Sequence, residues 1–286
     1  MILRFPAYRR YSDARVEVND AMMALLIGAR LGEHALSTSA ADPDALLPSL
    51  FGQIPGIARL NRTAGDAAGL LAEAEVHLAS MAIPYTLAVH GAFLAAAAQM
   101  VRDAGLDQRD AAFEVKRCGD LHKLPLDTGH EYIAERCRGQ TNPALLSLFH
   151  IARQLRNRII HSNRTPGSRL LQEFRTLQPA ARESWEGLAG RPLTAAVASG
   201  RLEPKEGELV AVLAVSRHLV QDINTLLARK LSREYWARVA VADYRALHPQ
   251  RFGERARRLR RLQGHAASFY AHLGLTEDEL KAAAGD

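Results

Sequence analysis

An arginine, an asparagine and a histidine lie close together in the stretch LRNRIIHSNRTPG, residues 155–167. These residues are Arg156, Asn157 and His161, and their types suit metal-independent cleavage of a phosphodiester. A histidine titrates near neutral pH, so it can take a proton from an attacking hydroxyl or give one to a leaving oxygen. An arginine binds the phosphate and stabilises the charge that grows on it, while an asparagine amide can orient either group. If the attacking group is a ribose 2′-hydroxyl, the substrate is RNA and no metal is required.

Helix geometry limits how these three side chains can meet. Asn157 and His161 are four residues apart and lie on one helix face, whereas Arg156 and His161 are five apart and differ by about 140° on a straight helix. They can converge on one phosphate if the helix unwinds near its end. They can also converge if the arginine of one chain meets the histidine of another in a symmetric dimer.

The residues around the motif predict the helix that carries it. Asn142 can cap its start and Pro143 suits the first helical position, while the Ser-Asn-Arg-Thr-Pro-Gly sequence after His161 should end it. Apolar residues repeat at helical spacing and should face a core: Leu148, Ala152, Leu155 and Ile159. On the other face a polar stripe of His150, Gln154, Asn157 and His161 could form a cleft wall or plain surface.

The composition predicts an all-α protein. Alanine and leucine are abundant, β-branched and aromatic residues are sparse, and no strand-length alternation or internal repeat is found. We expect helices at 18–36, with Asn19 or Asp20 as the N-cap, at 64–104 with a kink at Pro84, at 143–161, and at 207–247 as one long helix or a pair. The expected organisation is an N-terminal helical extension (1–63), a helical bundle (64–245) with an irregular excursion at 165–205, and a basic C-terminal helical tail (246–286).

An apolar helix that opens with Asn-Pro and carries Leu-Arg-Asn-x-x-x-His, in a bundle behind a long helix, resembles the HEPN family (higher eukaryotes and prokaryotes nucleotide-binding). The resemblance covers residues 64–245 and rests mainly on Arg156, Asn157 and His161. It implies an HEPN-like bundle that forms a homodimer with both motifs facing a shared cleft. It also implies a metal-independent endoribonuclease without a cofactor, in a toxin–antitoxin, phage-defence or RNA-processing setting, with an antitoxin or regulatory protein as a further partner.

Two other interpretations of the motif stay open. The same fold could bind RNA, DNA or a nucleotide without turnover, as some family members with degenerate motifs do. Alternatively, the motif could be only a capped helix end in a helical scaffold. Two further Arg-x4-His pairs occur by chance spacing, at Arg117–His122 and at Arg260–His265, but neither has an asparagine after its arginine or lies in a continuous helical pattern.

Arginines outside the motif are candidate RNA-backbone contacts. The net charge of +6 and the pI near 9.6 permit an anionic partner. Arg153 and Arg158 flank the motif, and the basic run at 251–261 is opposed only by Glu254. From that run we take Arg257, Arg258 and Arg261 as nucleic-acid-binding, which would make binding salt-sensitive. Three aromatic residues could stack on bases or belong to the core: Tyr235, Trp236 and Tyr244.

Glu75 and His77 could assist the motif as an auxiliary acid or phosphate-orienting group, or form a solvated helix face with Glu73. We expect His90 in a core or an interface. The histidines lack metal-ligand spacing and no phosphate-binding glycine loop is present, so neither a metal nor a nucleotide cofactor is proposed. With only Cys118 and Cys137, no apolar run of membrane-spanning length and no signal-peptide pattern, the sequence predicts a cytoplasmic protein without a membrane partner.

Overall fold

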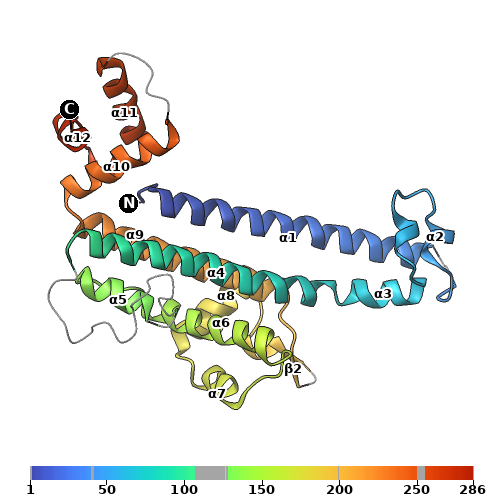
Figure 1. The fold of residues 1–286 in the computed structure, drawn as a ribbon. Helices are drawn as coiled ribbons and strands as arrows, with labels where there is room; N and C mark the ends of the chain where they lie inside the picture. Colours follow the sequence, from blue (N-terminus) through green and yellow to red (C-terminus); the bar gives the residue numbers. More distant parts are fainter. Residues whose placement is uncertain are drawn as a thin grey trace. The chain divides into compact units, whose positions relative to one another are not determined.

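A computed structural model of the chain describes residues 2–39, 42–106, 126, 128–198, 200–249 and 255–285. These residues are mostly helical, which confirms the all-α prediction (Figure 1). The elements are α1 (Pro6–Thr38), α2 (Leu47–Leu50), η1 (Ile57–Arg59), α3 (Ala64–Ala72), α4 (Ala74–Asp103), α5 (Gly129–Arg136), α6 (Pro143–His161), α7 (Ser168–Thr176), α8 (Pro179–Ala189), η4 (Leu193–Ala196), α9 (Glu206–Lys230), α10 (Arg233–Leu247), α11 (Arg255–Phe269), η5 (Ala271–Leu273) and α12 (Glu277–Ala284). Two short antiparallel strands, β1 (Val197–Ala198) and β2 (Arg201–Leu202), form the only sheet in these ranges.

The first long helix begins earlier than the sequence predicts. It starts at Pro6, whose missing N–H costs nothing at a first helical position, and it runs unbroken to residue 38. The predicted N-caps Asn19 and Asp20 are therefore wrong, since both lie in the helix interior. In the polar stretch that precedes Asn19, the side chain of Tyr11 is buried in the core.

The other predicted helices are found with small differences. The stretch 64–104 is two helices, α3 and α4, separated at Glu73, and Pro84 lies inside α4. The stretch 207–247 is a pair, α9 and α10, because Ser232 caps the second helix by accepting a hydrogen bond from the Tyr235 amide at 3.1 Å. Residues 107–125 and 127 lie outside the described residues, and α5 begins at Gly129.

The chain divides into two compact units that are interleaved along the sequence. Unit 1 contains residues 1–15, 87–153 and 214–286, and unit 2 contains residues 16–86 and 154–213. The division into three consecutive segments stays a prediction. The expected excursion at 165–205 lies in unit 2 and consists of α7, α8, η4 and the β1–β2 hairpin.

The N-terminal segment is built into the core of unit 1. The Leu3 amide donates to Asn224 Oδ1 at 2.9 Å, and Asn224 Nδ2 donates back to the Leu3 carbonyl at 2.7 Å. Both residues are buried, so this reciprocal pair satisfies backbone groups that would otherwise lose water without compensation. Phe5 then packs between Phe93 and Trp236.

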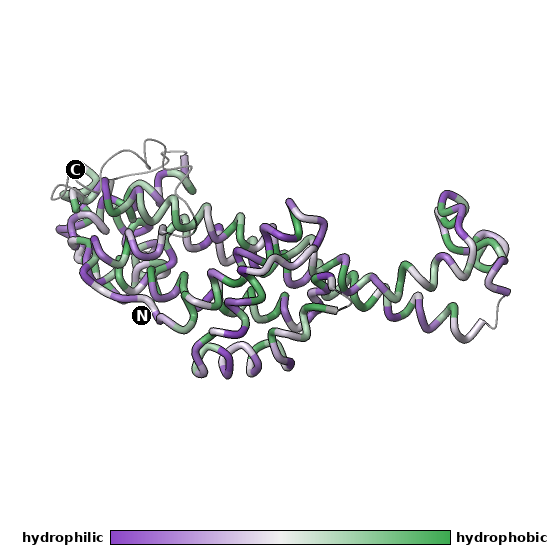
Figure 2. The backbone as a smooth tube through the Cα atoms, turned by 90° about the horizontal axis from the view of Figure 1, so that it is seen from below, coloured by the Kyte–Doolittle hydropathy of each residue, from purple (hydrophilic) through white to green (hydrophobic). Residues whose placement is uncertain are grey.

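Hydrophobic and hydrophilic positions alternate along the helices, as expected when each helix buries one face (Figure 2).

Helix α4 is, within the described ranges, the one helix long and apolar enough to span a membrane by length and composition alone. Half of its most apolar window is buried inside the protein. Ile83 is fully buried on this helix, and so are Leu87 and Ala97. Helix α4 therefore has the character of a core helix.

A buried polar network crosses this core. The Tyr11 hydroxyl lies 2.7 Å from Ser216 Oγ, which lies 2.8 Å from His90 Nδ1, and His90 Nε2 lies 2.9 Å from His130 Nε2. One histidine must be the donor and the other the acceptor in the last contact, so the two rings cannot both be protonated. Burial, and then the neighbouring ring, hold the pKa of His90 well below its usual range. Burial, followed by the charge of His150, lowers the pKa of His130 to about 3.

These depressed values predict acid-sensitive stability. In the unfolded chain a histidine binds a proton near pH 6.5, whereas folded His130 resists protonation until about pH 3. These two groups should therefore make no pH-dependent contribution above neutrality, and the free energy of unfolding should fall as the pH drops below 6.5, with His130 contributing about 2 kcal/mol of that fall near pH 5. Urea unfolding at several pH values measures this fall.

Two variants separate the buried pair from histidines in general. His130→Leu should show a shallower pH dependence, because one of the two depressed groups is gone. His272→Ala removes an exposed histidine and should keep the full dependence. Equal slopes in the wild-type chain and in His130→Leu would contradict the assignment.

Candidate functional site

Helix α6 begins as the sequence predicts. Asn142 Oδ1 accepts hydrogen bonds from the amides of Ala144 and Leu145, at 3.0 and 3.2 Å, and Pro143 is the first helical residue. The apolar face predicted for this helix is also confirmed. Leu148, Ala152 and Leu155 are buried, and Ile159 is partly buried. The opposite face is therefore the one that carries the polar residues.

The helix remains regular up to His161 and then ends abruptly. The amides of Ser162 and Arg164 both donate to the Arg158 carbonyl, at 3.2 and 3.1 Å, and Asn163 and Arg164 adopt left-handed backbone conformations with φ of 45° and 62°. These two residues turn the chain out of the helix axis. A side chain at Gly167 would lie 2.2 Å from Arg158 Nη2, so the glycine leaves room for that guanidinium.

Arg156 and Asn157 form a pair on the last turns of α6. Arg156 Nη1 donates to Asn157 Oδ1 at 2.9 Å, and both side chains are partly buried. Oδ1 is the main hydrogen-bond acceptor of an asparagine side chain, and a guanidinium has none. Once Oδ1 is bonded to Arg156, the groups left to meet a ligand are N–H donors on a positive centre. Such a pair suits an anion, above all a phosphate oxygen.

His161 is exposed at the final residue of α6. Within the described residues it has no hydrogen bond or ion pair, and none joins it to Arg156. Since the helix does not unwind before His161, the two side chains leave it about 140° apart. The sequence permits Arg156 and His161 to converge either within one chain or across a symmetric dimer. The regular helix does not bring them together within one chain.

The other predicted residues on α6 have partners within the chain. Gln154 Nε2 donates to Glu173 on α7, which also accepts from Arg169 Nε at 3.2 Å. His150 Nε2 lies 3.7 Å from Glu131. Arg153 also has an interaction within the chain, and Arg158 Nη1 donates to Ser162 Oγ at 3.4 Å. These residues support the helix and its terminal turn.

Glu75 and His77 also have structural partners. Glu75 Oε1 accepts a hydrogen bond from the Glu206 amide, the first of α9, at 3.0 Å, and it pairs with Arg30 at 3.6 Å. A carboxylate at a helix N-terminus is favourable because it binds free amides at the positive end of the dipole. His77 Nε2 lies 3.2 Å from Glu73, one turn earlier. No hydrogen bond joins Glu75 or His77 to the motif in the described part of the chain.

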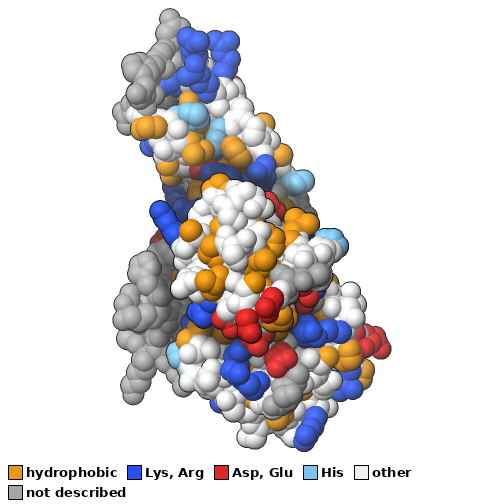
Figure 3. Space-filling model, turned by 90° about the vertical axis from the view of Figure 1, so that its right-hand side faces the viewer, with side chains coloured by type: hydrophobic (Ala, Val, Ile, Leu, Met, Phe, Trp, Pro, Cys, Tyr) orange, Lys and Arg blue, Asp and Glu red, His pale blue; other side chains and the backbone are white. Residues whose placement is uncertain are grey.

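Of the arginines predicted to bind nucleic acid, Arg153 and Arg158 lie on α6, and the other three lie on α11 in unit 1. Arg257 and Arg261 are exposed and Arg258 is partly buried. Figure 3 shows Lys and Arg side chains gathered over this helix. Tyr235 and Trp236 belong to the core, whereas Tyr244 is only partly buried.

Tyr244 lines a pocket with three rings that we did not predict as site residues: His248, His265 and Phe269. The spacing of Arg261, His265 and Phe269 in the sequence is a signal that could have placed them on one face of a helix.

The described residues contain no group of three or more side chains suited to hold a metal ion. Comparison with family models, with curated proteins and with solved structures finds no match for this chain. The geometry at the end of α6 therefore carries the functional interpretation.

The donor character of the Arg156–Asn157 pair can be tested by reversing it. In Asn157→Asp, a carboxylate of nearly the same shape would form an ion pair with Arg156 and repel a phosphate. We expect the melting temperature to be unchanged or higher and the affinity for single-stranded RNA to fall about tenfold, roughly 1.4 kcal/mol. Fluorescence anisotropy with a labelled RNA measures the affinity.

Asn61→Asp is the matched control, because it changes the charge equally at an exposed position before α3. An equal loss of affinity in both variants would show that only net charge matters at Asn157.

Proposed function

We propose that this protein is a metal-independent endoribonuclease of the HEPN type, with Arg156, Asn157 and His161 as its catalytic residues. The observation that supports this most directly is an exposed histidine one turn beyond a guanidinium–amide pair whose remaining groups are donors. The pair would bind the phosphate of a scissile linkage and stabilise its transition-state charge. The resemblance at the motif extends the same assignment to the fold.

The reaction would be an attack by the ribose 2′-hydroxyl on the adjacent phosphorus. His161 takes the hydroxyl proton as the bond from the 2′-oxygen to phosphorus forms, and the bond to the 5′-oxygen breaks. The proton is then returned to the leaving oxygen. The products are a 2′,3′-cyclic phosphate and a 5′-hydroxyl, so no metal or water is consumed in this step.

A symmetric homodimer would complete the site. Within one chain Arg156 and His161 leave α6 in different directions. In a two-fold dimer Arg156 of one protomer can meet His161 of the partner subunit, which gives two equivalent composite sites. A cytoplasmic nuclease of this kind would need restraint, and an antitoxin or regulatory protein would supply it in a toxin–antitoxin or phage-defence setting.

A second candidate is RNA binding without turnover. The missing contact between Arg156 and His161 within one chain favours it, because the donor pair can hold a phosphate without the histidine.

The cleavage assay is direct. Purified protein with excess EDTA should cut single-stranded RNA, and His161→Ala should abolish cleavage while RNA binding survives. His272→Ala, which removes an exposed histidine elsewhere, should retain activity. RNA that stays intact with the wild-type protein but is bound tightly would support the second candidate instead.

Mixing two inactive variants tests whether the site is shared between chains. A dimer of Arg156→Ala with His161→Ala would contain one site with both residues and one site with neither. After subunits exchange, about a quarter of wild-type activity should return, because about half of the dimers are mixed and each has one intact site. Activity that stays absent in the mixture, with subunit exchange confirmed, would place both residues in the same chain's site.

A further inference from the structure

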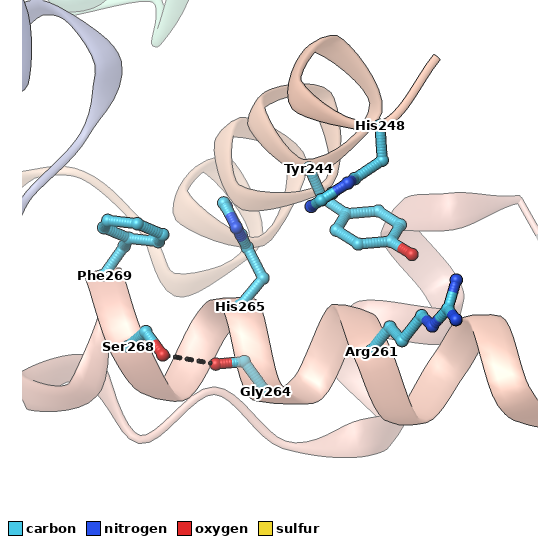
Figure 4. Close-up of a pocket in the computed structure, with 7 residues that line it drawn as sticks. All are labelled: Tyr244, His248, Arg261, Gly264, His265, Ser268 and Phe269. Atoms are coloured by element: carbon cyan, nitrogen blue, oxygen red, sulfur yellow. Dashed lines mark hydrogen bonds between the residues drawn. The ribbon is translucent and has the colours of Figure 1, made fainter. Parts of the chain in front are cut away.

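A shallow pocket of about 390 Å³ lies between the C-terminal end of α10 and the adjoining face of α11, within unit 1 (Figure 4). Its volume lies in the range of small-molecule sites. Tyr244 of α10 and the residue that follows this helix, His248, line one side, and α11 contributes Arg261, Gly264, His265, Ser268 and Phe269. The pocket is thus lined mainly by rings, with one guanidinium and no carboxylate in the lining.

The rings support one another. The ring centroids of Tyr244 and His248 are 4.9 Å apart, those of Tyr244 and His265 are 5.8 Å apart, and those of His265 and Phe269 are 4.8 Å apart. The Arg9 guanidinium lies 4.5 Å from the Phe269 ring and fixes it from another side. A set of fixed, partly exposed rings is a good surface for a planar ligand, because stacking costs little ordering.

A buried carboxylate sets the hydrogen-bonding state of His265. Asp243 accepts two bonds from Arg9, at 2.6 and 2.8 Å, and one from the Tyr270 hydroxyl at 2.9 Å. Burial alone would raise the pKa of Asp243, but these bonds outweigh it and hold the pKa below its usual range.

The carboxylate is therefore an acceptor, and His265 Nε2, 3.1 Å away, must be the donor. Nδ1 is left as an acceptor on a ring that lines the pocket, and it has no hydrogen-bond partner in the described part of the chain.

The charge of the pocket rim is positive. Arg261 is exposed and has no hydrogen bond or ion pair within the described ranges. Arg257 lies one turn earlier on the same face of α11, and Arg258 is beside it. In Figure 4 the Tyr244 hydroxyl points toward the side of the pocket where Arg261 lies. The rim therefore suits an anionic group of a ligand. The rings that form the floor of the pocket suit a planar ring of the same ligand that carries an N–H donor.

We infer that this pocket binds a nucleotide, with the base stacked on Tyr244 and His248, a base N–H donated to His265 Nδ1, and the phosphate bound by Arg261. A free nucleotide and a nucleotide within an RNA strand share this chemistry. The inference rests on the lining of the pocket and does not depend on the chemistry at the end of α6.

The test uses the full-length His161→Ala protein, so that cleavage cannot consume the probe. Each of the four ribonucleoside monophosphates, an eight-nucleotide RNA, a nucleoside and inorganic phosphate are titrated separately. Tyr244→Ala should weaken nucleotide or RNA binding about tenfold through the loss of stacking, whereas Tyr244→Phe, which keeps the ring, should stay within about twofold. The nucleoside and phosphate alone should bind more weakly than the nucleotide.

A matched pair of arginine variants separates the pocket from general charge. Arg261→Ala should weaken binding about fivefold, and it should reduce the slope of log affinity against log salt concentration by about one, as expected for the loss of one phosphate contact. Arg260→Ala, which lies outside the pocket lining, should weaken binding less. An effect on RNA alone would identify a strand as the ligand, and an effect on mononucleotides alone would identify a free nucleotide.

Binding that Tyr244→Ala leaves unchanged, or equal losses in Arg261→Ala and Arg260→Ala, would overturn the proposal. Because the pocket assay measures binding in an inactive background, a wild-type protein that cuts no RNA would contradict only the nuclease proposal.

Discussion

The hydrogen bond between the Arg156 guanidinium and the Asn157 amide is the interaction on which the candidate site depends. It turns two ordinary polar side chains into a surface that offers donors and positive charge. The long Arg156 side chain reaches its neighbour Asn157 on the last turns of α6, and Leu148, Ala152 and Leu155 are buried along the other face of this helix. The sharp end after His161 then leaves that histidine exposed, one turn beyond the pair. The pair proposed to bind an anion and the histidine proposed to transfer a proton are thus adjacent on one element, although Arg156 and His161 leave it in different directions.

Hydrogen bonds between buried polar groups also stabilise unit 1. Asn224 forms hydrogen bonds with both backbone polar groups of Leu3, and Asp243 accepts hydrogen bonds from Arg9, His265 and Tyr270. Each of these groups would cost several kcal/mol if it were buried alone, so their bonds favour one arrangement of the helices over others. Asp243 has an additional consequence, because it decides which nitrogen of His265 is a donor. A structural network thereby sets the chemistry of the pocket next to it.

Local signals in the sequence predicted local structure well. The Asn142–Pro143 start of α6, its apolar face and its end after His161 are all found. The predicted start of α1 was wrong. Asn19 and Asp20 are of the residue types that cap helices, but both lie inside the helix, which begins at Pro6.

Contacts distant in sequence could not be predicted from spacing. Glu75 lies against the start of α9 and His90 against His130 through tertiary packing alone. The pocket on α10 and α11 also needs two helices to be placed together, and only its α11 half shows a helical spacing. For the motif, the sequence indicated the residue types, whereas in the structure the helix is regular up to His161 and no hydrogen bond joins Arg156 to His161 among the described residues. That difference makes the dimer part of the proposal.

The most direct measurement of the central claim uses an oligonucleotide that is DNA except for a single ribonucleotide, incubated with the protein in EDTA. The account predicts one cut, on the 3′ side of the ribose, with a product whose mass shows a 2′,3′-cyclic phosphate. Cleavage at deoxy positions, or a product with a 3′-hydroxyl and a 5′-phosphate, would contradict attack by the 2′-hydroxyl and with it the roles assigned to Arg156 and His161.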